Sequence, residues 1–338
     1  MAVAGRLYGP ERRRYADPST EFDVLRLTDP AFASGFTAPG LKQFTRRGES
    51  LLHWSDRDGT RQAYLMQLKT GENRQLTDAK ALLPNTLTLL NDERTILYFD
   101  GPTLIEANLA TLKTRELHSA RNPQLAILQD GSVLVSEDNT VTRIAPKLPN
   151  KPNSFDGSVT SLLARPRRNQ AIVRVGNDVG IGQSTFLLDA LAGTKKPLQL
   201  EPGTTGQIAW TPSGRTFTYL HIPEDTHQLI TLRENAPDEN TDRLVAKTSQ
   251  FEYVSANTDA SVFTGASRSK AGPFVLILLR VTRRELTLCE HRASNPAMVQ
   301  PTFTPDSQTV LFASDRHGKP ALYSVKVEKF VEQTDPLA

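Results

Sequence analysis

The segment FTRRGESLLHWSDRDG, residues 44–59, aligns without a gap on FTPDSQTVLFASDRHG, residues 303–318. Both copies begin with Phe-Thr and end with Ser-Asp-Arg-x-Gly, and the tyrosine that follows the first copy, Tyr64, recurs as Tyr323 after the second. A sequence unit that recurs at a distance is typical of repeat architectures, in which each unit packs against its neighbours. The two ends of this chain are therefore predicted to be equivalent structural units.

Short apolar runs alternate with turn sequences inside the first copy. Residues 51–55 and 63–68 are two such runs, residues 56–59 between them have turn composition, and residues 73–77 form a third short run. Apolar runs of this length, separated by turns rich in Gly and Asp, favour antiparallel strands. With an entering strand near residues 41–44, the unit is predicted to be a four-stranded antiparallel sheet.

Weaker copies of the same pattern fill the chain between its two ends. They consist of an apolar residue, a polar turn and an apolar strand, and they lie at residues 89–99, 127–135, 163–173, 210–220 and 254–264. Their spacing, roughly 36 to 48 residues, is close to the length of a propeller blade. The two ends bring the number of units to about seven, within the usual range for propellers. The sequence predicts an all-β, seven-bladed β-propeller of four-stranded antiparallel blades.

The two ends of the chain indicate how this ring closes. The last unit stops near Val327, where an outer strand is still missing, and the sequence Leu-Thr-Asp at residues 27–29 repeats residues 76–78 at the outer end of the first unit. We expect an N-terminal strand, Val24–Leu27, to complete the last blade. Such a strand pairs an edge that would otherwise stay open and joins the two ends of the chain.

Composition supports one domain. The chain has 338 residues, of which 38% are apolar and 23% are charged, as is ordinary for a globular protein. The proline-rich stretch at residues 146–155 is expected to be a long loop between strands, because repeat copies flank it on both sides. We expect a single propeller domain over residues 1–338, with terminal extensions at about residues 1–20 and 331–338.

The net charge and the hydropathy of the sequence limit the kinds of partner that the protein is expected to bind. A net charge of +3 is too small to indicate nucleic-acid binding, which usually needs a clustered basic face. The apolar run Phe274–Leu279 has only the length of a strand, far below that of a membrane span, and the N-terminus lacks the apolar core of a signal peptide. The single cysteine, Cys289, excludes an intrachain disulfide. We expect a cytoplasmic protein with no nucleic-acid or membrane partner.

The last unit, residues 300–327, resembles the repeat of Tol-associated, WD40-like propellers and, more specifically, the oligogalacturonate lyases. Residues 23–30 and the unit at residues 44–78 share this resemblance. It implies a seven-bladed propeller that cleaves short pectin-derived uronides by β-elimination. In that chemistry a divalent metal, typically manganese, binds the substrate carboxylate, and a histidine base removes the acidified C5 proton.

The resemblance also implies where such a site would lie, and this chain has other residues at those positions. Met298 and Gln300 occupy the places of two family histidines, and Asn295 that of a glutamine. Tyr253 stands where a further histidine ligand is implied, and Gln207 where the base is implied. Amide oxygens without carboxylate or imidazole partners are a poor site for manganese. We expect these five residues to line a polar central cavity with no cofactor, with manganese bound only if the chain is an active lyase.

Two further groups of residues are expected to be structural. The six histidines have no metal-binding spacing such as HExxH, and each is expected to lie on the surface or within a hydrogen-bonded structural position; they are His53, His118, His221, His227, His291 and His317. Asp56 and Asp315 of the repeated turn are expected to accept backbone N–H groups inside their hairpins. The arginine that the resemblance implies in the fourth unit has no matched counterpart near Ser184–Thr185.

Three functions remain open on the sequence alone, and with them the question of enzymatic activity. The first is a lyase-like propeller whose metal-dependent site is lost or altered and which binds a small uronide, another polar ligand or a protein. The second is an active lyase that cleaves pectin-derived oligogalacturonides through a rearranged site. The third is a Tol-type interaction propeller, which would need export, and no export signal is visible in the sequence.

Overall fold

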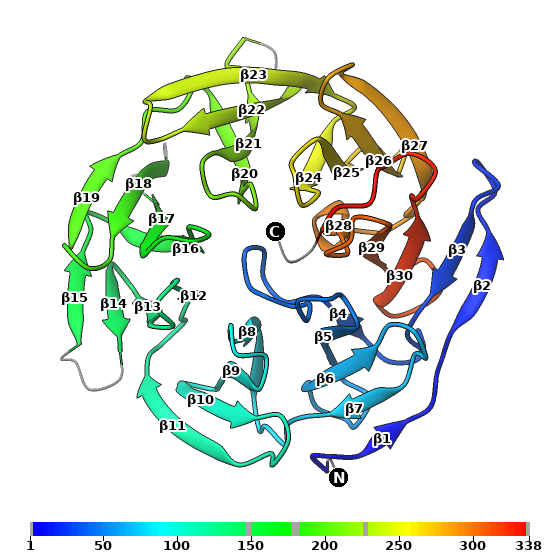
Figure 1. Ribbon diagram of the computed structural model, residues 1–338, viewed down its shortest axis with the longest axis horizontal. Helices are drawn as coiled ribbons and strands as arrows, with labels where there is room; N and C mark the ends of the chain where they lie inside the picture. The colour runs from blue at the N-terminus through cyan, green and yellow to red at the C-terminus, as the bar shows by residue number, and fades with distance from the viewer. Residues whose placement is uncertain (1–2, 146–149, 177–182, 226–228, 336–338) are drawn as a thin grey trace.

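The computed structural model describes residues 3–145, 150–176, 183–225 and 229–335. The strands of these residues form seven antiparallel sheets arranged in a ring (Figure 1). We call the sheets blades 1 to 7, in the order in which the chain forms their inner strands. The one helix in the described ranges is the short 3-10 helix η1, Pro296–Met298. The predicted all-β, seven-bladed propeller is confirmed.

Blades 2 to 6 each contain four consecutive strands, which follow one another from the centre outward. Blade 2 contains β8 (Leu82–Leu89), β9 (Thr95–Asp100), β10 (Thr103–Asn108) and β11 (Thr114–Ser119). Blade 3 contains β12 (Leu125–Ile127), β13 (Val133–Glu137), β14 (Thr140–Ile144) and β15 (Lys151–Ser154). Blade 4 contains β16 (Ser158–Ala164), β17 (Gln170–Gly176), β18 (Gln183–Asp189) and β19 (Thr194–Pro197). Blade 5 contains β20 (Thr204–Trp210), β21 (Phe217–Ile222), β22 (Ile230–Ala236) and β23 (Thr241–Thr248). Blade 6 contains β24 (Phe251–Ala256), β25 (Val262–Ser267), β26 (Phe274–Leu279) and β27 (Arg284–Glu290).

The N-terminal segment closes the ring. Blade 7 begins with β28 (Thr302–Phe303), β29 (Thr309–Ser314) and β30 (Ala321–Lys326). Its fourth strand is β3 (Asp23–Arg26), which pairs antiparallel to β30 with Val24 opposite Val325. The predicted closure by an N-terminal strand is confirmed, with bounds one residue earlier than expected.

Part of the expected N-terminal extension, residues 1–20, is also built into the ring. Strand β2 (Arg13–Ala16) pairs with β3, and strand β1 (Leu7–Tyr8) pairs with β7 of blade 1, so blades 1 and 7 each have a fifth strand. The segment runs along the outer rim from one blade to the next (Figure 1). It therefore holds blades 1 and 7 together at the point where the ring closes.

Blade 1 departs from the predicted unit at its inner edge. It contains β4 (Ser34–Gly35), β5 (Ser50–Ser55), β6 (Gln62–Gln67) and β7 (Asn73–Gln75) in addition to β1. The inner strand was expected near residues 41–44, but there only a single bridge joins Phe44 to Leu51. Residues 36–43 leave the sheet as a loop, because Pro39 cannot donate a backbone hydrogen bond and Gly40 has a φ of 84°. We call this segment the inner loop.

The repeated aspartates fasten each blade to the chain that enters it. The Asp56 carboxylate accepts the backbone N–H of Ala33 at 2.7 Å, and the Asp315 carboxylate accepts that of Ser294 at 2.8 Å. The expectation that these carboxylates act inside their own hairpins is wrong, because the acceptor for the turn glycine in each hairpin is the aspartate backbone carbonyl. In blade 2, Asp100 has the same role and accepts the N–H of Ala81 at 2.6 Å.

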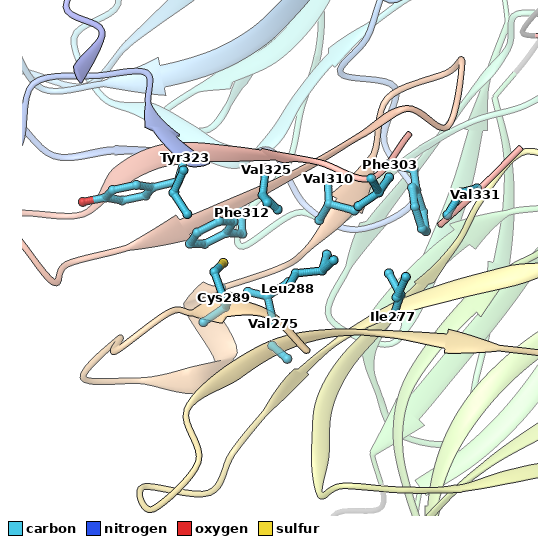
Figure 2. Packing of buried hydrophobic residues seen from close by; sticks show 14 of the residues in the cluster. Val275, Ile277, Leu288, Cys289, Phe303, Val310, Phe312, Tyr323, Val325 and Val331 are labelled. Atoms are coloured by element: carbon cyan, nitrogen blue, oxygen red, sulfur yellow. The ribbon is translucent and has the colours of Figure 1, made fainter. Parts of the chain in front are cut away.

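Apolar side chains fill the space between neighbouring blades. On blade 7, Val310, Phe312 and Tyr323 face blade 6, where they pack with Val275 and Leu288 (Figure 2). The alternate residues of the same strands face blade 1 instead; they are Leu311, Ala313 and Leu322. Successive side chains of a strand point to opposite faces, so each central strand is buried on both sides. Burying each large side chain stabilises the fold by about 1.5–3 kcal/mol.

Ion pairs with one buried partner each connect blades 4, 5 and 6. Arg165 of blade 4, 2% exposed, donates to both carboxylate oxygens of Asp238 in blade 5, at 2.9 and 2.6 Å. The buried Glu234 of blade 5 accepts Arg280 of blade 6 at 2.7 Å. Burial of Glu234 opposes its ionisation, but the hydrogen bonds from Arg280 and Arg243 outweigh that effect and lower its pKa. The ring is thus held by charge pairs as well as by apolar contacts.

Deleting the residues before Phe32 removes β1, β2 and β3 and leaves the edge of β30 unpaired. We expect the melting temperature to fall by more than about 10 °C, because the apolar surface of blade 7 is exposed with it. Deleting only residues 1–9, which removes β1 alone, is the control and should have a smaller effect. Calorimetry checks both, and an unchanged melting temperature in the longer deletion would contradict the closure by β3.

Replacing Glu234 with Gln should lower the free energy of unfolding by about 2 kcal/mol at pH 7, because two arginines lose their shared carboxylate. A carboxyl group with a lowered pKa in the folded state contributes stability above its unfolded pKa and loses it as the pH falls through the folded value. The difference between wild type and Glu234→Gln should therefore shrink below about pH 4. Urea unfolding at pH 7 and pH 3 measures it, with the exposed Glu328→Gln as control. A difference that is the same at both pH values would contradict this account.

Candidate functional site

The inner strands of the blades enclose a central cavity of about 460 Å³. Its wall comes from blades 4 to 7 and from the inner loop of blade 1; among the lining residues are Leu163, Gln207, Tyr253 and Thr302. A smaller cavity of about 150 Å³ adjoins it and shares Ala38, Pro39, Leu163 and Gln207 with it. The volume of the larger cavity lies within the range of small-molecule binding sites.

A larger hollow of about 670 Å³ lies elsewhere, between blades 7 and 1. It is lined by several charged side chains, and four of them form two pairs: Arg14 lies 3.6 Å from Asp23, and Lys326 lies 3.5 Å from Glu328. Paired surface charges of this kind need no ligand. We therefore take the central cavity as the candidate site.

The inner loop is fixed at its two ends and spans the centre between them. Trp54 Nε1 donates to the Phe36 carbonyl at 3.0 Å, and the backbone N–H of Lys42 donates to Thr88 Oγ1 at 3.1 Å. At the tip, a Cβ on Gly40 would lie 2.8 Å from a methyl carbon of Leu163 in blade 4. The loop from blade 1 thus reaches the opposite side of the ring, and its tip is packed tightly enough to require glycine.

Three of the five predicted site residues meet in the central cavity. Gln207, Tyr253 and Gln300 line it from blade 5, blade 6 and the entrance to blade 7. Gln207 Oε1 accepts the backbone N–H of Val254 at 2.9 Å, so this side chain also ties blade 5 to blade 6. Among the described residues, the Tyr253 hydroxyl and the Gln300 amide have no hydrogen-bond partner. Burial raises the pKa of Tyr253, which keeps its hydroxyl protonated as a donor.

The structure places the other two, Asn295 and Met298, outside the described lining of this cavity. Asn295 is the N-cap of η1, where its Oδ1 accepts the backbone N–H of Ala297 at 3.0 Å. Met298 packs against the apolar cluster between blades 6 and 7. Both residues therefore have local structural roles that the sequence position alone did not indicate.

The donor set of the cavity does not fit manganese. None of the described residues lining it is a histidine, cysteine, aspartate or glutamate, and no group of three such residues in the described parts of the chain could hold a metal ion. The available side-chain donors are neutral; they include Thr37, Gln43, Gln207, Tyr253 and Gln300. Neutral oxygens alone are weak ligands for a divalent transition metal.

The histidines have other partners. The buried His53, His221 and His291 donate from Nε2 to Asn73 Oδ1, the Pro202 carbonyl and the Ser267 carbonyl, at 2.8, 2.8 and 3.0 Å. His317 is exposed and its Nδ1 lies 2.8 Å from the Tyr323 hydroxyl. His118 lies on the outer strand β11, and His227 lies outside the described residues.

Arg174 lines the smaller cavity from blade 4, a position that the sequence did not predict. Its guanidinium donates to the carbonyls of Gly206 and Thr205 at 2.9 and 2.8 Å, while its buried Nε has no partner among the described residues. It lies opposite Thr185 in the sheet, so the region where an arginine was sought was one strand away. A charged residue within the apolar run of β17 was the available signal.

Thr37 and Gln43 of the inner loop were also missed. Thr37 Oγ1 and Gln43 Oε1 are buried and have no hydrogen-bond partner within the described protein. A buried polar atom without a partner costs about 1–3 kcal/mol, so such atoms gather where a ligand or water completes them. No signal in the sequence marked Thr37, and Gln43 lies within residues 41–44, where a strand was expected.

The ring of blades with a polar cavity at its centre defines the chain as a propeller with the oligogalacturonate lyase fold. A solved oligogalacturonate lyase in complex with manganese matches with a TM-score of 0.84 and 20% identity, over 96% of this chain and 98% of that one. The oligogalacturonate lyase of Vibrio parahaemolyticus matches with a TM-score of 0.85 and 19% identity, over 96% and 99%.

Sequence comparison finds the same kind of relatives as the comparison of folds. The oligogalacturonide lyase of Pectobacterium atrosepticum is 23% identical over 93% of this chain and 95% of its own length. The oligogalacturonate lyase of Dickeya dadantii is 23% identical over 94% and 97%. No protein-family model matches the chain. The resemblance to the oligogalacturonate lyases is confirmed in sequence and in fold.

Within the described residues, no helix has the length and hydropathy of a membrane span.

The three cavity residues should differ in their effect on stability. Gln207→Ala removes the acceptor of the Val254 N–H and should lower the free energy of unfolding by about 1–2 kcal/mol. Gln300→Ala and Tyr253→Phe remove groups without a protein partner and should change it by less than about 0.5 kcal/mol. Urea unfolding measures all three, and a large loss for Gln300→Ala would show that its amide is part of the protein's own hydrogen bonding.

Proposed function

We propose that the chain binds a small uronide or another polar carbohydrate in its central cavity, and that the metal-dependent elimination implied by the lyase resemblance is lost or altered. The observation that carries the proposal is that Gln207, Tyr253 and Gln300, which stand where the resemblance implies histidines, line the cavity wall. An amide takes up no proton near neutral pH, so Gln207 does not serve as the base that removes a proton from carbon.

The chemistry of the wall supports a carbohydrate. The Tyr253 hydroxyl and the Gln300 amide are available to the hydroxyl groups of a sugar, and the buried oxygens of Thr37 and Gln43, in residues of the same wall, have no partner within the described protein. The indole of Trp210 adds an apolar, aromatic surface to the same cavity. Binding sites of this size combine apolar walls with a few polar groups that fix the orientation of the ligand.

Two cations support a uronide in particular. Lys42 and Arg46 are among the lining residues, so the cavity has a positive side toward the inner loop. Lys42 Nζ also contacts Glu93 at 2.7 Å, which holds the ammonium group in place without closing it off, since its side chain remains 30% exposed. A carboxylate next to such groups forms charge-assisted hydrogen bonds, which are stronger than neutral ones.

The alternative is an active lyase that cleaves pectin-derived oligogalacturonides. It would need a base and a metal site formed by residues other than those aligned with the family. Nothing in the described cavity wall favours it over binding alone, because the wall has no histidine or carboxylate. The same experiment separates the two.

The test uses saturated and unsaturated digalacturonate. Calorimetry should detect binding without added manganese, and Gln300→Ala and Tyr253→Phe should weaken it about tenfold, equal to the loss of one or two hydrogen bonds. With manganese present, ultraviolet absorbance should show no unsaturated product above a protein-free control. Turnover would establish the lyase alternative, and the absence of both binding and turnover would contradict the proposal.

A further inference from the structure

The internal repeat places equivalent polar clusters on the outer parts of blades 1 and 7. The alignment of residues 44–64 with residues 303–323 makes Arg57 equivalent to Arg316, Asp58 to His317 and Tyr64 to Tyr323. The fifth strands of the two blades also match in sequence. Strand β1 lies in Arg6-Leu-Tyr8 and strand β2 begins with Arg13-Arg-Tyr15, so each brings an arginine and a tyrosine to its cluster. The two clusters therefore occupy equivalent positions but differ in the charges of their side chains.

In blade 1 a carboxylate forms the centre of the cluster. Asp58 accepts the hydroxyl of Tyr64 at 2.7 Å and that of Tyr8 at 2.7 and 2.9 Å, and it lies 3.9 Å from the Arg6 guanidinium. Burial opposes its ionisation, but the two tyrosine hydroxyls outweigh that effect and lower its pKa. Arg57 stacks on the Tyr8 ring and pairs with Glu11. The cluster of blade 1 is therefore complete, with an anion among donors.

In blade 7 the carboxylate is missing and a cation has been added. His317 replaces Asp58, and its ring contacts Tyr15 edge-on, with the centroids 5.3 Å apart. In the sheet, Arg26 lies opposite Tyr323, as Gln75 lies opposite Tyr64, so a neutral amide has become a guanidinium. The Tyr323 hydroxyl points away from the apolar cluster, toward this group (Figure 2).

Two buried donors of blade 7 lack acceptors. Tyr15 Oη and Arg26 Nε are buried and have no hydrogen-bond partner among the described residues, and the Arg13 and Arg26 side chains form no ion pair there. Burial and the nearby charges of Arg316, Arg26 and Arg13 lower the pKa of His317, so its ring is a neutral partner for the Tyr323 hydroxyl and brings no negative charge to the cluster.

The acids next to this cluster are already paired. Asp17 is buried, lies 3.8 Å from Arg316 and accepts the backbone N–H of Glu290 at 3.0 Å. Asp315 binds Ser294, and Asp23 pairs with Arg14. None of them takes the place that the Asp58 carboxylate has in blade 1. The cluster of blade 7 keeps a net positive charge and unpaired donors.

We propose that Arg13, Tyr15, Arg26, His317 and Tyr323 form a binding site for an external oxyanion, a carboxylate or a phosphate group. The oxyanion lies where blade 1 has its own aspartate carboxylate and accepts hydrogen bonds from the tyrosines and Arg26. His317 now occupies that place, with its Nδ1 2.8 Å from the Tyr323 hydroxyl, so its exposed ring has to turn aside for the oxyanion to enter. The site lies on the rim of blade 7, apart from the central cavity, and does not depend on the function proposed for that cavity.

Calorimetry with acetate and with inorganic phosphate, each at the ionic strength of a sodium chloride control, tests the site. We expect one saturable site with a dissociation constant on the order of millimolar, typical of a single anion held by a few charge-assisted hydrogen bonds. Binding should also raise the pKa of His317 in an NMR titration, because the anion offsets the nearby guanidinium charges. Binding of one probe alone supports the site and assigns its ligand class.

Two variants and a control complete the test. Arg26→Gln copies blade 1 and should weaken binding at least about tenfold. His317→Asp supplies an internal carboxylate and should abolish binding while raising the melting temperature without added anion. Arg215→Gln, at an exposed turn of blade 5, should leave both unchanged. No saturable binding beyond the chloride control, or binding that Arg26→Gln and His317→Asp leave unchanged, would overturn the proposal.

Discussion

The antiparallel pairing of β3 with β30 is the constraint on which the rest of the structure depends. It joins the two ends of the chain within one sheet and sets blade 7 beside blade 1. Without it the ring would have two open edges, and the inner strands would have no reason to face a common centre. The outer strands β1 and β2 extend the same pairing across the junction, where Arg57 and Arg316 each stack on a tyrosine of the N-terminal segment.

The fold and the chemistry at its centre are set by different residues. Apolar side chains between blades and acids at the blade entrances determine the ring, whereas Thr37, Gln43 and Gln300, polar residues that line the central cavity, belong to neither group. These polar residues of the cavity wall are therefore free to change without loss of the fold. This separation explains how a chain can match the solved lyases over nearly its whole length while its wall has no histidine or carboxylate among the described residues.

The features of the fold that could be predicted from the sequence are those that recur along the chain. The copies at residues 44–59 and 303–318 indicated the blades, and the missing outer strand after Val327 indicated the closure. Where the chain departs from the repeat, prediction was weaker. The inner loop interrupts a strand that the pattern favoured, and Thr37 and Gln43 reach the cavity only because of that interruption. Similarly, Asn295 and Met298 were expected at the centre, but the turn of η1 directs them elsewhere.

Arg174 shows a second limit of the sequence. Its place beside the cavity depends on register with β18 and on the carbonyls of β20, which belong to another blade. Contacts between blades join residues far apart in the chain, and a repeat pattern fixes the order of the strands but not which side chain of each strand faces the centre. The same holds for Gln207, whose bond to Val254 is a contact between blades.

The most direct test of the central claim is a crystal structure of the protein soaked with digalacturonate and manganese, with anomalous diffraction recorded to locate the metal. The account predicts sugar density in the central cavity, in contact with Tyr253 and Gln300, and no anomalous peak there. A manganese peak in the cavity, coordinated by protein side chains, would contradict it.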